Sequence, residues 1–181
     1  DWSSAVCSSD LVAMLIAVLA LVLALSETLG KAAQTTALSL NIEAANLWNF
    51  FQAKTIRGTL VRTAADEMET GLAGFNNPAL KGAMTERIAE WRKTAARYDS
   101  EPETKEGRKE LAARAKEAEA KRDHSLAAYH HYELASASVQ IAIVLASAEV
   151  ITGVAALVWI SAGLGILGVA FCAIEIGRAH V

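Results

Sequence analysis

Residues 134–174, LASASVQIAIVLASAEVITGVAALVWISAGLGILGVAFCAI, form an apolar run of 41 residues in which Glu149 is the only charged residue. A single helix of this length would extend about 61 Å, twice the roughly 30 Å hydrocarbon core of a lipid bilayer. Thr152 and Gly153 lie near the centre of the run and form its best helix breaker. The run therefore predicts a hairpin of two transmembrane helices, over residues 135–151 and 154–174.

An earlier apolar run, LVAMLIAVLALVLAL at residues 11–25, predicts another transmembrane helix over residues 12–25. As a helix it would extend about 22 Å, which is less than the core thickness and is expected if its upstream end is truncated. Small residues recur in all three spans with helical spacing, which favours close helix packing in lipid. These stripes are Ala13, Ala17, Ala20 and Ala24; Ser138, Ala142 and Ala146; and Ser161, Gly165, Gly168 and Cys172. We expect the two hairpin stripes to pack together.

Nearly all charged residues lie between the apolar runs, from Glu27 to Glu133. Over those residues 16 Lys and Arg balance 16 Asp and Glu, so the segment lacks the basic character of a nucleic-acid-binding protein. This segregation of charge is typical of a chain divided between lipid and water. The predicted class is an all-α integral membrane protein.

The charged segment, residues 26–134, predicts a helical soluble stalk. Residues 26–70 contain no proline and predict one long helix that continues out of the first span. Asn77 and Pro78 predict the start of a second helix, residues 78–98, with one buried stripe. That stripe is Met84, Ile88, Trp91, Ala95 and Tyr98. Ser100 and Glu103 fit a capping box, from which a third helix is expected to run into the second span. The result is a long antiparallel, coiled-coil-like segment between the first and second of three transmembrane helices.

Polar and aromatic residues gather on the outgoing helix. Two interpretations are open: this cluster binds a partner helix or a small ligand, or it forms the inner seam of the stalk, where Asn or Gln fixes the register. The seam is the favoured interpretation, and Asn49 and Arg57 belong to the same cluster. The candidate interaction or structural positions in the stalk are Asn46, Trp48, Phe51, Gln52, Lys54 and Trp91.

His130 and His131 are the most concentrated metal-type ligands, but adjacent residues point about 100° apart on a helix. His130 shares a face with Glu133, and a metal site would need further donors, such as Glu43 or a second chain. We therefore expect no metal, and interpret the histidines as membrane-interface residues beside Tyr129 and Tyr132.

Glu149 is either functional, as ionisable residues inside spans usually are, or close enough to the proposed turn to reach the headgroups. The sequence GLGILG at residues 163–168 lies inside a span without the strand and helix of a dinucleotide site, so no cofactor is expected. The stalk carries no recognisable catalytic arrangement, and we predict no catalytic residues and no enzyme.

Three motifs resemble an uncharacterised bacterial membrane family, domain of unknown function 4337. They are NLWNFFQAKTIR at residues 46–57, ARYDSEPETKEGRKEL at 96–111 and AAYHHYELASASVQIAIVLAS at 127–147. The resemblance covers most of residues 13–174 and implies a multi-pass protein of the bacterial inner (cytoplasmic) membrane with a helical soluble segment, without an activity. The chain departs from the family at Glu149, where an apolar residue is expected, and lacks the expected basic turn between the last two spans.

The leading hypothesis is a membrane-anchored scaffold or interaction module. Its expected partners are the lipid bilayer and a second copy or another membrane protein, without nucleic acid. An alternative is a subunit of a channel or transporter, with Glu149 or Gln140 lining a path. A third is a stalk that senses a metal or ligand through His130 and His131.

Both ends of the chain resemble translated short-read sequencing adapter: DWSSAVCSSDL at residues 1–11 and EIGRAHV at residues 175–181. Ala5 is the one departure from the first match. We therefore expect the native sequence to comprise residues 12–174 and take no evidence from Cys7, Arg178 or His180.

Overall fold

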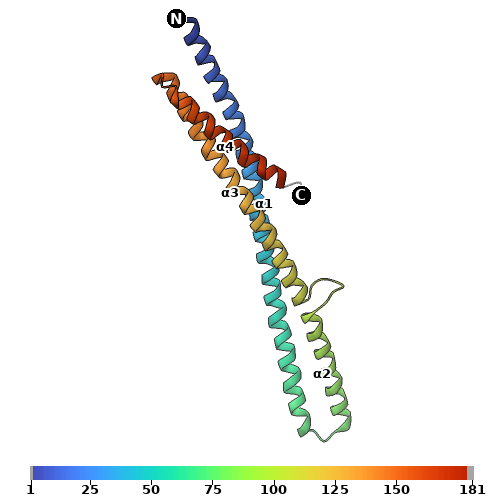
Figure 1. Ribbon diagram of the computed structural model, residues 1–181. Coiled ribbons are helices and arrows are strands. Elements are labelled where there is room, and N and C mark those ends of the chain that lie inside the picture. The colour runs from blue at the N-terminus through green and yellow to red at the C-terminus, as the bar shows by residue number, and fades with distance from the viewer. Residues whose placement is uncertain (1, 179–181) are drawn as a thin grey trace. The chain divides into compact units, whose positions relative to one another are not determined.

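The structure, a computed structural model, describes residues 2–178 of the chain and the side chains of residues 10–178 (Figure 1). Residue 1 and residues 179–181, which belong to the expected adapter-derived ends, lie outside this range. Within it the chain forms helices and no strand, which confirms the all-α class. The elements are α1 (Trp2–Gly71), the 3-10 helix η1 (Leu72–Gly74), α2 (Pro78–Asp99), α3 (Arg108–Thr152) and α4 (Ala156–Arg178).

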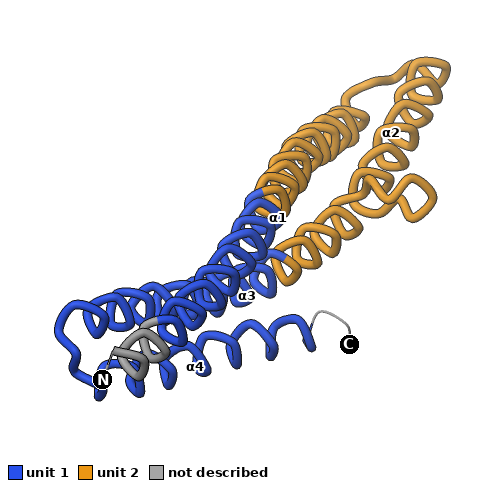
Figure 2. Tube along the Cα trace, turned by 90° about the horizontal axis from the view of Figure 1, so that it is seen from above, with its two compact units in different colours: residues 1–38, 122–181 blue, residues 39–121 orange. Residues whose placement is uncertain are grey.

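The chain divides into two compact units, coloured in Figure 2. Unit 1 consists of Asp1–Leu38 and Arg122–Val181, and unit 2 consists of Ser39–Lys121. Helices α1 and α3 each contribute to both units.

Unit 1 contains the apolar runs, and its α3 and α4 form the predicted hairpin. α3 ends at Thr152 and α4 begins at Ala156, so the helix break falls at the predicted position. Gly153 adopts a φ of +71°, which glycine reaches without a steric penalty. Among the described residues, three helices (α1, α3 and α4) are long and apolar enough to cross a membrane.

The predicted small-residue stripes of the hairpin pack against each other. Ser161 donates a hydrogen bond of 2.7 Å to the carbonyl oxygen of Ala142, and both residues are fully buried. At Gly168 an added Cβ would lie 2.5 Å from Cγ2 of Val139, so a larger residue there would force the neighbouring groups of α3 to shift. This contact confirms the pairing expected from the sequence.

The alanine stripe predicted to pack in the first span does not pack against another helix of the chain. Its four alanines are exposed, and the face of α1 that packs in unit 1 carries Val12, Leu19 and Ser26 instead. A Cβ at Gly165 would lie 2.6 Å from Cδ2 of Leu19, so the small residue at this contact is on α4 and the large one on α1. Close packing needs a small residue on only one of two helices, which the pattern of α1 alone does not reveal.

In unit 2, residues 39–71 of α1 face two shorter partners, α2 and the beginning of α3. The buried core against α3 consists of Ala44, Leu47, Leu111, Ala115 and Ala118. α2 runs back beside α1, where Gly58 faces Tyr98 (Figure 1). Ile88 and Ala95, from the predicted stripe of α2, are buried. Asn77 caps α2 as predicted, since its side-chain oxygen accepts a hydrogen bond of 3.0 Å from the Ala79 amide.

The capping box at Ser100 and Glu103 is wrong, because α3 begins at Arg108. Ser100 instead terminates α2, with its amide bonded to the Ala96 carbonyl. Its hydroxyl donates to a carboxylate further along the chain, that of Glu110, at 2.6 Å. Lys105, with a φ of 57°, lies in the intervening turn and redirects the chain before α3 starts.

Candidate interaction surfaces

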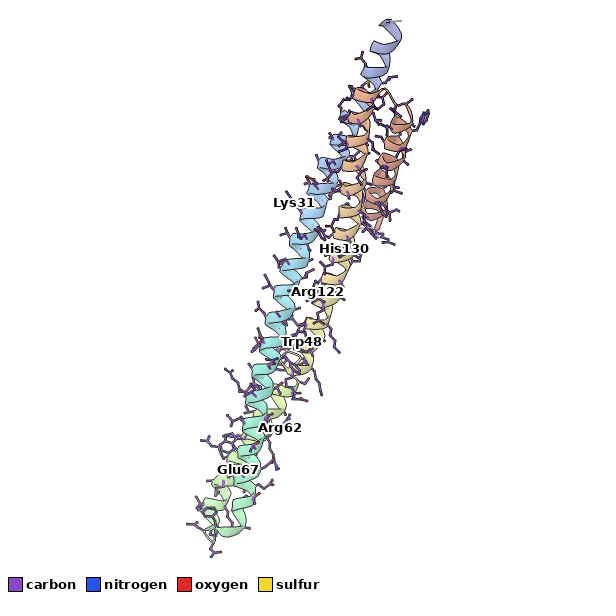
Figure 3. The ribbon with its side chains drawn as sticks, turned by 90° about the vertical axis from the view of Figure 1, so that its left-hand side faces the viewer. Lys31, Trp48, Arg62, Glu67, Arg122 and His130 are labelled. Carbon is purple, nitrogen blue, oxygen red and sulfur yellow. The ribbon has the colours of Figure 1, made fainter. Side chains whose placement is uncertain are left out.

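Trp48 and Phe51 form part of the seam between α1 and α3 in unit 2. Both are half-buried and pack against the core in an edge-to-face arrangement, with ring centroids 5.4 Å apart. The Trp48 indole, labelled in Figure 3, donates a hydrogen bond of 2.8 Å to the carboxylate of Glu119 on α3. Glu119 was not singled out in the sequence, although it lies one helical turn beyond the buried Ala115.

Lys54 is the one buried lysine among the described residues, with 7% of its surface exposed. Its ammonium group lies 3.8 Å from the Glu106 carboxylate and 5.3 Å from the ring centroids of Phe50 and Tyr98. A carboxylate and two aromatic faces therefore surround this charge, which a cation needs when it leaves water. The interpretation of Lys54 as a seam residue fits this environment.

The other polar members of the cluster do not lie in the seam. Asn46, Asn49, Gln52 and Arg57 are exposed, so the prediction that an Asn or Gln fixes the register inside the stalk is wrong. The helical period explains the error: positions 44, 47, 51 and 54 face the partner helices, and positions 46, 49 and 52 fall outside that arc. The seam itself is made of apolar and aromatic residues around one lysine.

The opposite side of α1 in unit 2 exposes large apolar residues. Ile42, Ile56 and Leu60 expose 54%, 69% and 68% of their surfaces. At 100° per residue they share one side of the helix with Asn49 and Gln52, and we call these five residues the outer α1 face. The sequence pattern hinted at this face, because these apolar positions are out of phase with the core positions.

Trp91 is half-buried on α2, with the Arg87 guanidinium 5.7 Å from its ring centroid. Arg92, the next residue, forms ion pairs with Asp66 and Glu69 of α1. The ring of Trp91 therefore contacts a side chain of its own helix, α2.

Carboxylates and cations cluster around the turn between α2 and α3. Asp99 lies within 3.9 Å of Arg62, 3.5 Å of Arg108 and 3.4 Å of Lys109. The hydrogen bond from Ser100 lowers the pKa of Glu110, and the hydrogen bond from Arg97 lowers the pKa of Glu101. These groups stabilise the turn between α2 and α3, whose residues were predicted to begin the third helix.

Lys121 and Glu117 form an i,i+4 ion pair on α3, at 2.6 Å. That hydrogen bond lowers the pKa of the Glu117 carboxyl. Exposed pairs of this kind contribute little to stability individually.

The two histidines of unit 1 have different environments. His130 is exposed and lies 3.5 Å from Glu133 on the same face of α3, as the helical spacing predicts. His131 is half-buried and contacts Glu175 and the ring of Phe171, both on α4. The described residues contain no group of three or more His, Cys, Asp or Glu side chains placed to hold a metal ion.

Glu149 is half-buried one turn before α3 ends, and its backbone carbonyl accepts a hydrogen bond of 2.7 Å from Gly153. Gln140, the other residue suggested to line a path, donates a hydrogen bond to Glu27 of α1 at 3.3 Å.

The chain matches the model of a family described as a domain of unknown function (DUF4337) over residues 8–176. No curated protein and no solved structure shows significant similarity to the chain. The match covers both predicted hairpin spans, the first span and all three motifs on which the resemblance rests. The chain belongs to the DUF4337 family.

Proposed function

We propose that the chain is a membrane-anchored helical scaffold of the bacterial inner membrane, which self-associates through the outer α1 face. One observation carries this proposal. Ile42, Ile56 and Leu60 are more than half exposed in the unit that also carries most of the charge, where water is the expected solvent. Apolar surface in water favours association by about 25 cal/mol per Å² buried.

The spacing on this face suits a second copy of the same helix. Ile42, Asn49 and Ile56 are seven residues apart, which is the repeat of one core position in a two-stranded coiled coil. A polar Asn at such a position specifies the register and the number of strands, at a cost in stability. Asn49 would then fix the register between copies, rather than inside one stalk.

Charge at the flank of the face fits two parallel copies. Arg62 and Glu67, both labelled in Figure 3, are five residues apart, as are the residues that pair across a parallel coiled coil. Glu67 has no ion-pair partner among the described residues. Copies anchored in the same membrane with the same orientation would present their stalks in parallel.

Cysteine crosslinking in native membranes tests this proposal. In a chain with Cys7 and Cys172 replaced by Ser, Asn49→Cys should crosslink to a dimer under mild oxidation. Glu43→Cys is the matched control, since it is exposed on the same helix but off the outer α1 face. Replacement of Ile42, Ile56 and Leu60 by Gln should abolish the dimer formed through Asn49→Cys. Equal crosslinking at both positions, or none at either, would contradict the proposal.

A further inference from the structure

A groove of about 320 Å³ lies between α1 and α3 within unit 1. Its walls carry Glu27, Lys31 and Gln34 from α1, and Tyr129, Glu133 and Ser136 from α3. Each set follows the spacing i, i+4, i+7, so each forms one face of its helix. We call this feature the interfacial groove; Figure 3 labels Lys31 in its wall.

Small residues at the floor of the groove bring the two helices together. Ser26 is fully buried, and its hydroxyl lies 3.2 Å from that of Ser136. One turn further along α1, a Cβ added to Gly30 would lie 3.3 Å from Cβ of Tyr132. The backbones therefore approach closely here, and the longer polar side chains on either side form the walls.

The groove lies where both helices change from apolar to polar sequence. The apolar run of α1 ends at Leu25, two residues before Glu27, and the apolar run of α3 begins at Leu134, directly after Glu133. If these helices span a membrane, as the proposed function requires, the groove lies at the level of the lipid headgroups. Tyrosines are enriched at that level, and Tyr129 and Tyr132 both line the groove.

The charged groups of the groove do not neutralise one another. Lys31 has no ion-pair partner among the described residues. Glu27 accepts a hydrogen bond from the uncharged amide of Gln140, and Glu133 faces His130 on its own helix. One ammonium and two carboxylates therefore remain available to a ligand that carries both signs of charge.

We propose that the interfacial groove binds a phosphoethanolamine headgroup. The primary ammonium of this group donates hydrogen bonds to Glu27 and Glu133, and its phosphate accepts from Lys31 and a tyrosine hydroxyl. A phosphoglycerol headgroup has no ammonium and would place its phosphate beside two carboxylates. A choline headgroup has no N–H to donate. The groove therefore selects ethanolamine lipids over anionic ones.

Native mass spectrometry of the full chain in detergent tests this selection. The protein is mixed with equal amounts of phosphatidylethanolamine and phosphatidylglycerol that have the same acyl chains. We expect about a tenfold excess of the ethanolamine adduct, since one charge-assisted hydrogen bond contributes roughly that factor. Glu27→Gln with Glu133→Gln should bring the ratio close to one, whereas Glu43→Gln, an exposed carboxylate of α1 outside the groove, should leave it unchanged.

A second arm adds glycerophosphoethanolamine, which carries the headgroup without acyl chains. Displacement of the lipid by this compound would show that the headgroup alone is recognised, and retention of the lipid would show that recognition needs the lipid-embedded form. Equal adducts of both lipids on the unmodified chain would overturn the headgroup proposal. Loss of all lipid adducts would instead count against membrane anchoring, and the same spectrum reports the oligomeric state separately.

Discussion

Units 1 and 2 share α1 and α3 but differ in what they expose. Unit 1 packs through Ser161, Gly165 and Gly168 and exposes large apolar residues such as Val18 and Trp159. Unit 2 packs through Leu47 and Leu111 and surrounds this core with charged residues. The difference is the one expected between lipid and water, because lipid gives apolar side chains no reason to be inside.

Ion pairs show the same contrast. In unit 2, ion pairs link α1 to α2 through Arg92 and Arg62, and α2 to α3 through Asp99. Lys54 of α1 pairs with Glu106 in the turn before α3. In unit 1, hydroxyl and backbone contacts such as that between Ser161 and Ala142 join the helices, together with the contact of His131 with Glu175. The outer α1 face is the exception in unit 2, since it exposes Ile56 and Leu60, and this exception motivates the proposed self-association.

The largest effect is expected in the core of unit 2. Leu111 is fully buried, so Leu111→Ala should lower the free energy of unfolding by about 2–5 kcal/mol. Hydrogen exchange of the full chain in detergent should show the largest increase within residues 39–121. Leu80→Ala is the control, because Leu80 is exposed and its replacement should lower the free energy of unfolding far less. Equal losses of unfolding free energy for the two variants would contradict the assignment of Leu111 to the core of unit 2.

Substitution of a glycine tests the close packing of α4 against α3 in unit 1. Gly168→Leu should force α4 away from Val139 and cost about 1–3 kcal/mol of stability, seen as a lower thermal midpoint in detergent. Gly163→Leu serves as the control, since a Cβ there meets no atom within 4 Å. If Gly163→Leu were as harmful as Gly168→Leu, close helix packing would not explain the role of the small-residue stripe.

A smaller effect is expected at the indole hydrogen bond. Trp48→Phe keeps an aromatic ring in the seam but removes the donor to Glu119, which should cost about 1 kcal/mol. Circular dichroism during thermal unfolding measures the change. Glu119→Gln, which keeps an acceptor, should be milder, and a stabilised Trp48→Phe variant would contradict the interpretation of this contact.

The smallest effect is a dependence of the stability of unit 2 on pH. The pKa values of Glu101, Glu110 and Glu117 lie below their ordinary value of 4.5, because Arg97, Ser100 and Lys121 respectively donate hydrogen bonds to them. The folded chain therefore binds protons less readily than the unfolded chain at these sites. Their contribution is present above the ordinary pKa and is lost as the pH falls through the lowered values.

Thermal midpoints measured from neutral pH down to about pH 3 should reveal this loss. Glu110→Gln should make the decline shallower, because it removes one of the three titrating carboxyls. An unchanged decline in that variant would show that other groups cause the acid sensitivity.

The predictions from the sequence were accurate where the residues of a single helix determine its ends and its buried face. The break at Gly153, the Asn77 cap and the stripe of Ile88 and Ala95 follow from local chemistry. The errors concern relations between helices. The packing predicted for the alanines of the first span is not seen within the chain, because Leu19 packs over a glycine of α4 instead. The start of α3 was predicted too early, because Ser100 bonds to Glu110 instead of Glu103.

The candidate residues also divide into those whose position was predicted correctly and those whose position depends on how the helices pack. Trp48, Phe51 and Lys54 lie in the seam, as their aromatic or amphipathic character suggests. Asn46 and Gln52 were assigned to it by their chemistry, but their phase on the helix places them outside. The interfacial groove could be recognised only once Gly30 and Tyr132 were seen to meet, since they are far apart in the sequence.

Cysteine labelling tests most directly whether α1 passes from lipid into water. Val18 and Phe50 are apolar residues exposed on the same helix, and Phe50 lies off the outer α1 face. With Cys7 and Cys172 replaced by Ser, Val18→Cys and Phe50→Cys are treated with a water-soluble maleimide in permeabilised native membranes. We expect rapid labelling at position 50 and almost none at position 18, with both labelled after denaturation. Equal labelling of the two positions before denaturation would show that α1 does not pass from lipid into water.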